Sequence, residues 1–381
     1  MFNIRGLSKF LYRSFINNRG TNYRLTLKRL GVLLLALVIY IPAEVLIWSG
    51  LILDNFLFRM YREIEIESPV FIIGNPRSGT TFLQRLLAKD HQMFFSMKTW
   101  EIFASPSITS RKVLVFLVRI ARSIGMSISK RIHRLESLWA EGNRIHRLAL
   151  RAPEEDEYLF IHIFSALKIW SFAAMTADAA PFIRYDQEMP EREKNRMMDF
   201  YQRCLQRHVY FHHGEYKHYL AKNPNFSPMI RTILKRFPGA KFIYLIRDPR
   251  DAVSSHLSLK EREWQMLGSP LEPYASREFI LDASEYWYNY PLEVVDQLEQ
   301  NQGMIILFDD LTGNAKKVVE EIYQRFGFEL SAEYREILIE ETEKARQHES
   351  EHNYDTLEMG LSEEQIKSRF NEVYQRFEFP D

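Results

Sequence analysis

The chain has 381 residues, with 50 lysines and arginines balanced by 50 acidic residues, and 46% of its residues are hydrophobic. This globular composition excludes a disordered or collagen-like chain. The single cysteine, Cys204, permits no internal disulfide, so a disulfide scaffold is excluded as well. A chain of this kind is typical of the cytosol.

The neutral total hides an uneven distribution of charge. Residues 1–30 contain seven basic side chains and no acidic ones, whereas the remaining residues contain 43 basic and 50 acidic side chains. A nucleic-acid-binding protein would carry basic stripes on its body, so we expect no nucleic-acid partner. A basic N-terminal segment in front of an acidic body instead indicates contact with an anionic surface such as a membrane.

Residues 31–53 form an apolar segment in which Glu44 is the only charged residue. As a helix the segment would be about 35 Å long, which is sufficient to cross a hydrocarbon layer of about 30 Å. Pro42 and Glu44 near its middle argue against a simple span. A span, a bent helix that dips into one leaflet, and a buried core helix remain open, and we expect membrane association with a cytoplasmic catalytic domain.

The body, residues 66–381, is expected to be one catalytic domain. Apolar runs predict strands at residues 69–73, 219–221, 241–246 and 304–308, and helical spacing follows the first and third of them. Strands that alternate with helices predict an α/β fold in three layers, α/β/α, around a central parallel sheet.

Residues 105–151 form a basic amphipathic stretch, with ten lysines and arginines but only Glu136 and Glu141 as acids. Such a stretch is typical of a solvated helical face. The alternative is a lid that faces an anionic ligand or a membrane.

A glycine-rich loop follows the first predicted strand. Gly74 and Gly79 enclose four residues, as in phosphate-binding loops, whose backbone N–H groups and following helix face an anion. Loops that bind nucleoside triphosphates have lysine after the second glycine, but this chain has Thr80 there and carries Arg77 inside the loop. We therefore predict a site for one 5′-phosphate-like group, with Arg77 beside the group that is transferred.

Two motifs resemble the PAPS-dependent sulfotransferases, which use 3′-phosphoadenosine 5′-phosphosulfate (PAPS) as sulfuryl donor. Residues 75–81, Asn-Pro-Arg-Ser-Gly-Thr-Thr, are similar to the family's 5′-phosphosulfate loop, and Arg247 with Ser255 eight residues later matches its 3′-phosphate motif. The resemblance covers most of residues 68–380 and implies a P-loop sulfotransferase fold. It also implies that the donor is bound by Arg77, Ser78, Gly79, Thr80, Thr81, Arg247 and Ser255.

The family resemblance makes Lys222 a candidate to stabilise the leaving phosphate oxygen, because the family often has lysine at this place after a strand. Two positions near it differ from the family's usual catalytic bases. Pro224 stands where cytosolic members have histidine, and Ala221 stands where glycosaminoglycan-type members have glutamate. The acceptor hydroxyl therefore needs another base.

The acidic run after Pro153 is the best substitute for that base. Repulsion between neighbouring carboxylates could raise the pKa of one of them, and Glu155 is the first choice, ahead of Glu154 and Asp156. The sequence predicts a helix that starts at Pro153, and the alternative is that these acids only stabilise its first turn. The weaker candidates for the base are His91, His133 and His256.

The expected reaction is sulfuryl transfer from PAPS to a hydroxyl acceptor, which would be a lipid, a glycolipid or a carbohydrate. The alternatives are a P-loop phosphotransferase and a non-catalytic sulfotransferase-like binding protein. No metal is expected, because the clustered histidines at 208, 212, 213 and 218 lack the spacing of a metal motif.

Overall fold

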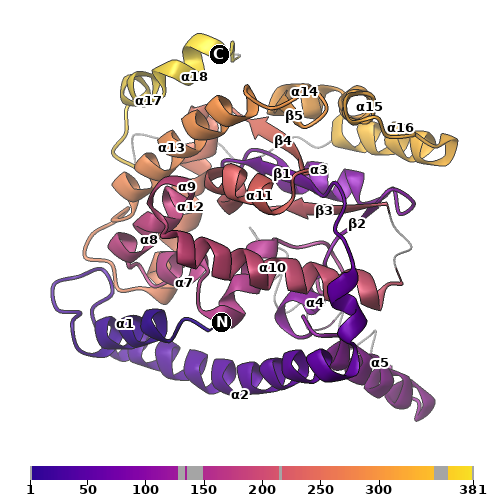
Figure 1. Ribbon diagram of the computed structural model, residues 1–381. Coiled ribbons are helices and arrows are strands. Elements are labelled where there is room, and N and C mark those ends of the chain that lie inside the picture. Colours follow the sequence, from indigo (N-terminus) through magenta and orange to yellow (C-terminus); the bar gives the residue numbers. More distant parts are fainter. Residues whose placement is uncertain (1, 128–133, 135–148, 214–216, 347–358, 380–381) are drawn as a thin grey trace.

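A computed structural model describes residues 2–127, 134, 149–213, 217–346 and 359–379 (Figure 1). Its centre is a parallel sheet of five strands in the order β2-β3-β1-β4-β5. The strands are β1 (Val70–Gly74), β2 (Phe94–Phe95), β3 (His218–Lys222), β4 (Lys241–Ile246) and β5 (Gly303–Leu307). The four strands expected from the sequence are present to within two residues at either end, and β2 is the addition.

Helices occupy most of the other described residues. Their bounds are α1 (Ile4–Phe15), α2 (Leu27–Leu57), α3 (Thr80–Leu87), α4 (Thr99–Phe103), α5 (Ile108–Ser123), α7 (Leu167–Phe172), α8 (Thr176–Ile183), α9 (Tyr185–Glu188), α10 (Glu191–Phe211), α11 (Ile230–Arg236), α12 (Pro249–Leu267), α13 (Arg277–Val295), α14 (Phe308–Gly313), α15 (Ala315–Phe326), α16 (Ala332–Arg346), α17 (Glu363–Arg369) and α18 (Asn371–Arg376). Short 3-10 helices are η1 (Arg59–Glu63), η2 (Asp156–Ile163) and η3 (Pro224–Met229).

The sheet is covered on both faces because its strands are apolar throughout. Successive side chains of a strand point to opposite faces. Phe71 and Ile73 therefore enter a core shared with α10, α11, α12 and α13, whereas Val70 and Ile72 enter a core shared with α3, α15 and α16. This confirms the predicted α/β/α layers around a parallel sheet.

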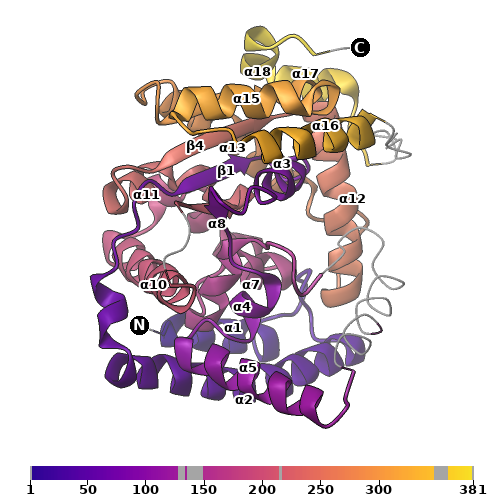
Figure 2. The same cartoon turned by 90° about the vertical axis from the view of Figure 1, so that its right-hand side faces the viewer.

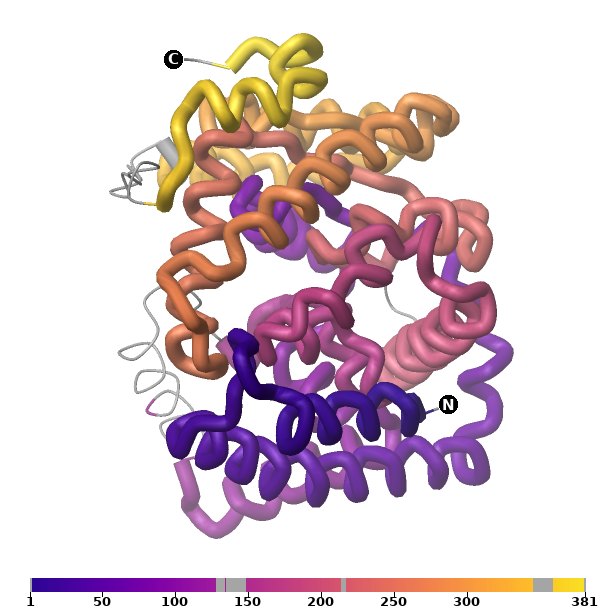
Figure 3. Tube along the Cα trace, turned by 90° about the vertical axis from the view of Figure 1, so that its left-hand side faces the viewer, coloured from indigo at the N-terminus to yellow at the C-terminus, as the bar shows by residue number. Residues whose placement is uncertain are grey.

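A further group of helices lies below the sheet in Figure 1, with α2 along the lower edge of the molecule. The apolar segment expected at residues 31–53 is part of this longer helix, Leu27–Leu57, which begins where the Thr26 side chain accepts a hydrogen bond from the backbone N–H of Arg29. In Figure 3, α1 lies along α2. Phe10 of α1 packs against Trp170 of α7, and Lys9 and Arg13 pair with Asp178 of α8, so the basic N-terminal segment is folded onto the body.

Candidate active site

The predicted donor-binding residues meet at one edge of the sheet. The strands are parallel, so the loops that follow their carboxyl ends lie at the same edge. The loop after β1 carries Arg77, and β3 ends at Lys222. Arg247 follows β4, and Phe308 follows β5. Since β1 lies between β3 and β4, the glycine-rich loop is flanked by Lys222 on one side and Arg247 on the other.

The loop between β1 and α3 needs its glycines. A Cβ at Gly79, whose φ is +83°, would lie 2.6 Å from a ring carbon of Phe308, and a Cβ at Gly74 would lie 2.5 Å from the carbonyl oxygen of Leu245. Ser227 secures the loop's start, since its hydroxyl bonds both the N–H and the carbonyl of Gly74. The loop leads directly into Thr80 and Thr81 at the start of α3, where backbone N–H groups have no partner within the helix.

Arg77 joins the two motifs that resemble the donor site. Its backbone has a left-handed φ of +72°, and its Nε donates to the Ser255 hydroxyl at 2.9 Å. Arg247 donates from Nη1 to the Arg77 carbonyl at 3.2 Å, and its guanidinium lies 4.5 Å from the centre of the Phe308 ring. Arg77, Arg247 and Ser255 thus form one cationic cluster, although Arg247 and Ser255 lie 170 and 178 residues after Arg77 in the chain.

Nearby acids also contact this cluster. Arg247 forms an ion pair with Asp251, Nη2–Oδ2 2.9 Å, and the Asp251 side chain is largely exposed. Arg250 pairs instead with Asp248, with an Nη2–Oδ2 distance of 2.6 Å, so its guanidinium is directed at that carboxylate. Asp251 rather than Asp248 is therefore the acid paired with Arg247.

A second charged group contains two of the predicted catalytic residues. Glu155 and Lys222 form a buried ion pair with an Oε1–Nζ distance of 2.9 Å. Lys168, which the sequence analysis did not single out, lies 3.7 Å from the other oxygen of Glu155. Lys168 stands at the start of a short helix, and no motif marked it.

The acidic run is arranged differently from the helix start that the sequence predicted. Pro153 forms an antiparallel bridge with Lys98, and the Glu154 N–H donates to the Met97 carbonyl, so this stretch is extended. The 3-10 helix η2 begins only at Asp156. Pairing with residues 97–98 keeps the backbone at residues 153–154 extended. Glu155 therefore reaches Lys222 from an extended chain and not from a helix.

Asp156 points away from that ion pair into the core. One oxygen accepts hydrogen bonds from the hydroxyls of Tyr201 at 2.6 Å and Tyr219 at 2.7 Å. Burial raises the pKa of Asp156 to about 7, although both tyrosines favour the charged form. Burial likewise raises the pKa of Glu157 to about 7. Burial, more than mutual repulsion, thus perturbs these carboxyls, and Asp156 is positioned as a structural anchor.

Of the weaker candidates for the base, His256 lies nearest to both charged groups. It follows Ser255 on α12 and is buried, and its Nδ1 has no hydrogen-bond partner among the described residues. Burial and the charges of Lys260, Lys168 and Arg77 lower its pKa well below the ordinary value, so the ring stays neutral. His91 is exposed in the turn before β2, and His133 lies outside the described residues.

Glu101, His208 and His212 come within 4.8 Å of one another and could hold a metal ion by composition. A buried cation already occupies this place, since Nη1 of Arg111 lies 2.7 Å from His208 and 3.6 Å from Glu101. Burial opposes ionisation of Glu101, but the histidines and Arg111 outweigh it and lower the pKa of Glu101. We interpret the group as a structural ion-pair network, which histidine spacing alone had not revealed.

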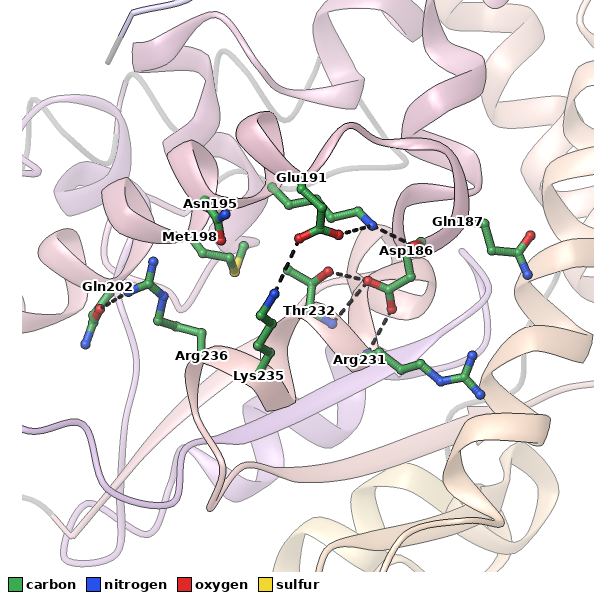
Figure 4. Close-up of a pocket in the computed structure, with 11 residues that line it drawn as sticks. Asp186, Gln187, Glu191, Asn195, Met198, Gln202, Arg231, Thr232, Lys235 and Arg236 are labelled. Carbon is green, nitrogen blue, oxygen red and sulfur yellow. Dashed lines mark hydrogen bonds and ion pairs between the residues drawn. The ribbon is translucent and has the colours of Figure 1, made fainter.

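A separate hollow of about 480 Å³ lies against α10 and α11 (Figure 4). Its charged groups pair with one another, as Lys194 does with Glu191, and Asp186 accepts from the backbone N–H of Arg231. Its lining includes none of the residues predicted to bind the donor or to act in catalysis. The loops predicted to bind the donor lie elsewhere, at the carboxyl ends of the strands.

Comparison with known proteins identifies the fold and the chemistry. The model of the sulfotransferase family matches residues 69–332, which include both loops and Lys222. The chain belongs to the sulfotransferase family. Its activity is therefore transfer of a sulfuryl group to an acceptor hydroxyl, as the two motifs predicted.

Two solved sulfotransferases share the fold. One is sulfotransferase STF9 from Mycobacterium avium, with a TM-score of 0.74, 19% identity, and coverage of 99% of this chain and 91% of that chain. The other is sulfotransferase STF1 from Mycobacterium tuberculosis H37Rv, with a TM-score of 0.72, 17% identity and coverage of 96% and 91%. In sequence, the chain is 24% identical to the omega-hydroxy-beta-dihydromenaquinone-9 sulfotransferase Stf3 of Mycobacterium bovis, over 74% of this chain and 67% of that protein.

Proposed function

We propose that this sulfotransferase uses PAPS as donor and acts on the hydroxyl of a membrane lipid from the cytoplasmic side. The observation that carries the choice of donor is the hydrogen bond from Arg77 to Ser255, together with the contact of Arg247 with the Arg77 carbonyl. These contacts bring the 5′-phosphosulfate loop and the 3′-phosphate motif within reach of one small molecule. A nucleotide with phosphates at both its 3′ and 5′ positions fits such a pair of cationic sites.

The donor's two ends would be held by different parts of the cluster. The N–H groups at the start of α3, with Ser78, Gly79, Thr80, Thr81 and Arg77, would bind the 5′-phosphosulfate. Arg247 and Ser255 would bind the 3′-phosphate, and Arg247 would exchange Asp251 for that phosphate. The Arg247 guanidinium lies over the face of the Phe308 ring, and this contact helps to hold it in place.

The buried ion pair would carry the transfer step. The acceptor oxygen forms a bond to sulfur while the bond between sulfur and the 5′-phosphate oxygen breaks, and 3′-phosphoadenosine 5′-phosphate leaves. Glu155 would accept the proton of the acceptor hydroxyl. Neutralising Glu155 removes the counter-charge of Lys222, whose ammonium is then available to stabilise the leaving oxygen.

Two observations support a lipid acceptor. The mycobacterial relative is named for a lipid-like hydroxylated menaquinone. The helix α2 is long and apolar enough to enter a membrane, and only 17% of its most apolar 18-residue stretch is buried in the protein. A carbohydrate acceptor would need neither feature.

The test is an acceptor assay with ³⁵S-labelled PAPS. Detergent-solubilised protein is incubated with labelled donor and either a total lipid extract or a set of soluble carbohydrates, and products are separated by chromatography. We expect label in a lipid product, absent with Arg77→Ala. Label in a carbohydrate alone would overturn the lipid acceptor, and no transfer of label by the wild type to any acceptor would overturn PAPS as donor.

A further inference from the structure

We propose that α2 and α5 together form a membrane-binding face that lies flat on an anionic leaflet and does not cross the bilayer. The outward side of α2 is apolar, as a membrane-binding face requires. Between Gly31 and Leu57 none of its exposed side chains is charged. The large exposed apolar residues of this stretch are Leu34, Leu35, Val38, Ile39, Ile41, Val45, Leu46, Ile52, Leu53, Phe56 and Leu57.

The charged residues of α2 beyond its first turn point into the protein and fasten the helix along its length. Glu44 accepts from the His162 ring at 2.7 Å. Asp54 pairs with Arg207 at 2.9 Å. Near the start of the helix, the buried Arg29 bonds the carbonyls of Ala173 and Leu267. These anchors hold both ends and the middle of α2 against one body.

Attachment along its length excludes a transmembrane orientation. A spanning α2 would have to separate Arg29, Glu44 and Asp54 from their partners and place the charge of Glu44 in hydrocarbon, where it is costly. The alternative is a helix that keeps these bonds and inserts its outward side into the headgroup region. Pro42 and Glu44, which argued against a simple span, are compatible with this orientation because one faces outward and the other inward.

The second helix extends the same surface. Asp54 accepts hydrogen bonds from the backbone N–H groups of Ile108 and Thr109, so the start of α5 is fixed to α2. The helices also approach closely at Gly50, where a Cβ would lie 2.4 Å from two serine hydroxyls. Figures 1 and 2 both show α2 and α5 together at the lower edge. The exposed apolar residues that α5 and its C-cap add are Val113, Phe116, Leu117, Ile120 and Ile124.

The charges beside this face fit an anionic leaflet. The α5 helix contains no acidic residue, and its Lys112, Arg119 and Arg122 are exposed. Exposed basic residues also stand at both ends of α2, with Arg24 before it, Lys28 in its first turn and Arg59 after it. Basic side chains at the edge of an apolar face attract anionic headgroups.

This membrane-binding face is also joined to the candidate active site. The segment that holds Glu155 continues into η2, whose Ile161 and His162 carbonyls accept hydrogen bonds from Tyr40 and Trp48 of α2. Only this link to a lipid acceptor rests on the proposed function. Docking itself requires neither donor nor acceptor, so the two ideas fail separately.

The first experiment is flotation of the full chain with vesicles. We expect the protein to float with vesicles of phosphatidylcholine and phosphatidylglycerol and to bind pure phosphatidylcholine more weakly. The double variant Phe116→Ser with Leu117→Ser should bind at least about tenfold more weakly. The triple variant Lys112→Gln, Arg119→Gln, Arg122→Gln should lose most of the preference for anionic lipid.

Ile339→Ser is the matched control, because Ile339 is exposed on α16 at the far side of the sheet. It should bind vesicles as the wild type does. Wild-type protein that fails to float, or α5 variants that float unchanged, would overturn the proposal.

The second experiment distinguishes lying from crossing. Arg19→Cys and Glu63→Cys place one thiol beyond each end of α2, and the natural Cys204 is buried. In inverted membrane vesicles from cells that produce the protein, an impermeant maleimide should label both positions equally. Labelling of one position only, with the other reached after detergent is added, would show a crossing helix and overturn the proposal.

Discussion

Glu155 and Lys222 form a buried ion pair with an Oε1–Nζ distance of 2.9 Å, although 67 residues separate them in the chain. One residue comes from an extended segment before η2 and the other from the end of β3. Lys222 thereby reaches the edge of the sheet beside the donor loop, and Glu155 is held next to it. A base and a cation that act on the two oxygens of an in-line transfer must be placed in this way.

Glu155→Gln should lower kcat by about 10²- to 10⁴-fold, because Gln cannot accept the proton of the acceptor hydroxyl. Binding of 3′-phosphoadenosine 5′-phosphate should persist, since the loop after β1 and Arg247 would hold the donor, whereas Glu155 pairs with Lys222 and Lys168. Rates of ³⁵S transfer and calorimetric binding measure the two effects. Glu154→Gln is the matched control and should reduce kcat much less.

If Glu155→Gln retains the wild-type rate while Glu154→Gln also remains active, Glu155 is not the base. His256, which is neutral and lies near both charged groups, would then take its place. Loss of nucleotide binding in Glu155→Gln would instead indicate that the ion pair supports the donor loop.

Asp251→Asn should tighten binding of 3′-phosphoadenosine 5′-phosphate by about two- to fivefold. Asp251 holds Arg247 through an exposed ion pair, and pairs of this kind contribute up to about 1 kcal/mol. Removing the carboxylate frees Arg247 and removes a negative charge beside the incoming phosphate. Titration calorimetry at low salt measures the change, and the gain should shrink at high salt.

Asp282→Asn provides the control for this effect, since Asp282 is an exposed acid that pairs with Arg369 on α17, away from the donor loop. Its affinity should equal that of the wild type. Weaker binding by Asp251→Asn would mean that the Asp251 carboxylate helps to position the nucleotide.

The effect of Asp156→Asn on the free energy of unfolding should be more favourable at pH 8 than at pH 4. Burial raises the pKa of Asp156 in the folded state to about 7, well above the 3.8 of an unperturbed aspartate. The folded state therefore binds more protons than the unfolded state between these values, so stability falls as pH rises through this window, by about 1.4 kcal/mol per pH unit. Asparagine does not titrate, and its carbonyl still accepts from Tyr201 and Tyr219.

Urea unfolding of both proteins from pH 4 to pH 8 checks this prediction. The stability of Asp156→Asn minus that of the wild type should increase towards pH 7 and then level off. A difference that stays constant with pH would show that Asp156 titrates normally in the folded protein.

Much of the fold was predictable because its strands are continuous apolar runs. All four expected strands lie in the sheet, and their order in the chain indicated parallel pairing. Strand β2 was not predictable, because two phenylalanines are too short a run, and their pairing depends on His218 and Tyr219 far along the chain. The helix α2 extends beyond the apolar run because Thr26 caps it and the polar Asn55 and Asp54 find partners on the body.

The candidate site was predictable where motifs are local. The loop that carries Arg77 and the eight-residue spacing of Arg247 and Ser255 can be recognised along the chain. The side chains that contact these residues cannot be recognised in this way, because Lys168 and Phe308 reach the site only through tertiary packing. The predicted helix start at Pro153 was wrong for a similar reason, since pairing with Lys98 holds the acidic run extended.

The most direct test of PAPS as the donor is calorimetric titration of the solubilised protein with 3′-phosphoadenosine 5′-phosphate, with Arg247→Ala alongside and ATP as the control ligand. We expect tight binding by the wild type, binding at least about tenfold weaker in the variant, and no comparable binding of ATP. Equal binding of ATP, or unchanged affinity in Arg247→Ala, would contradict the assignment of the donor site.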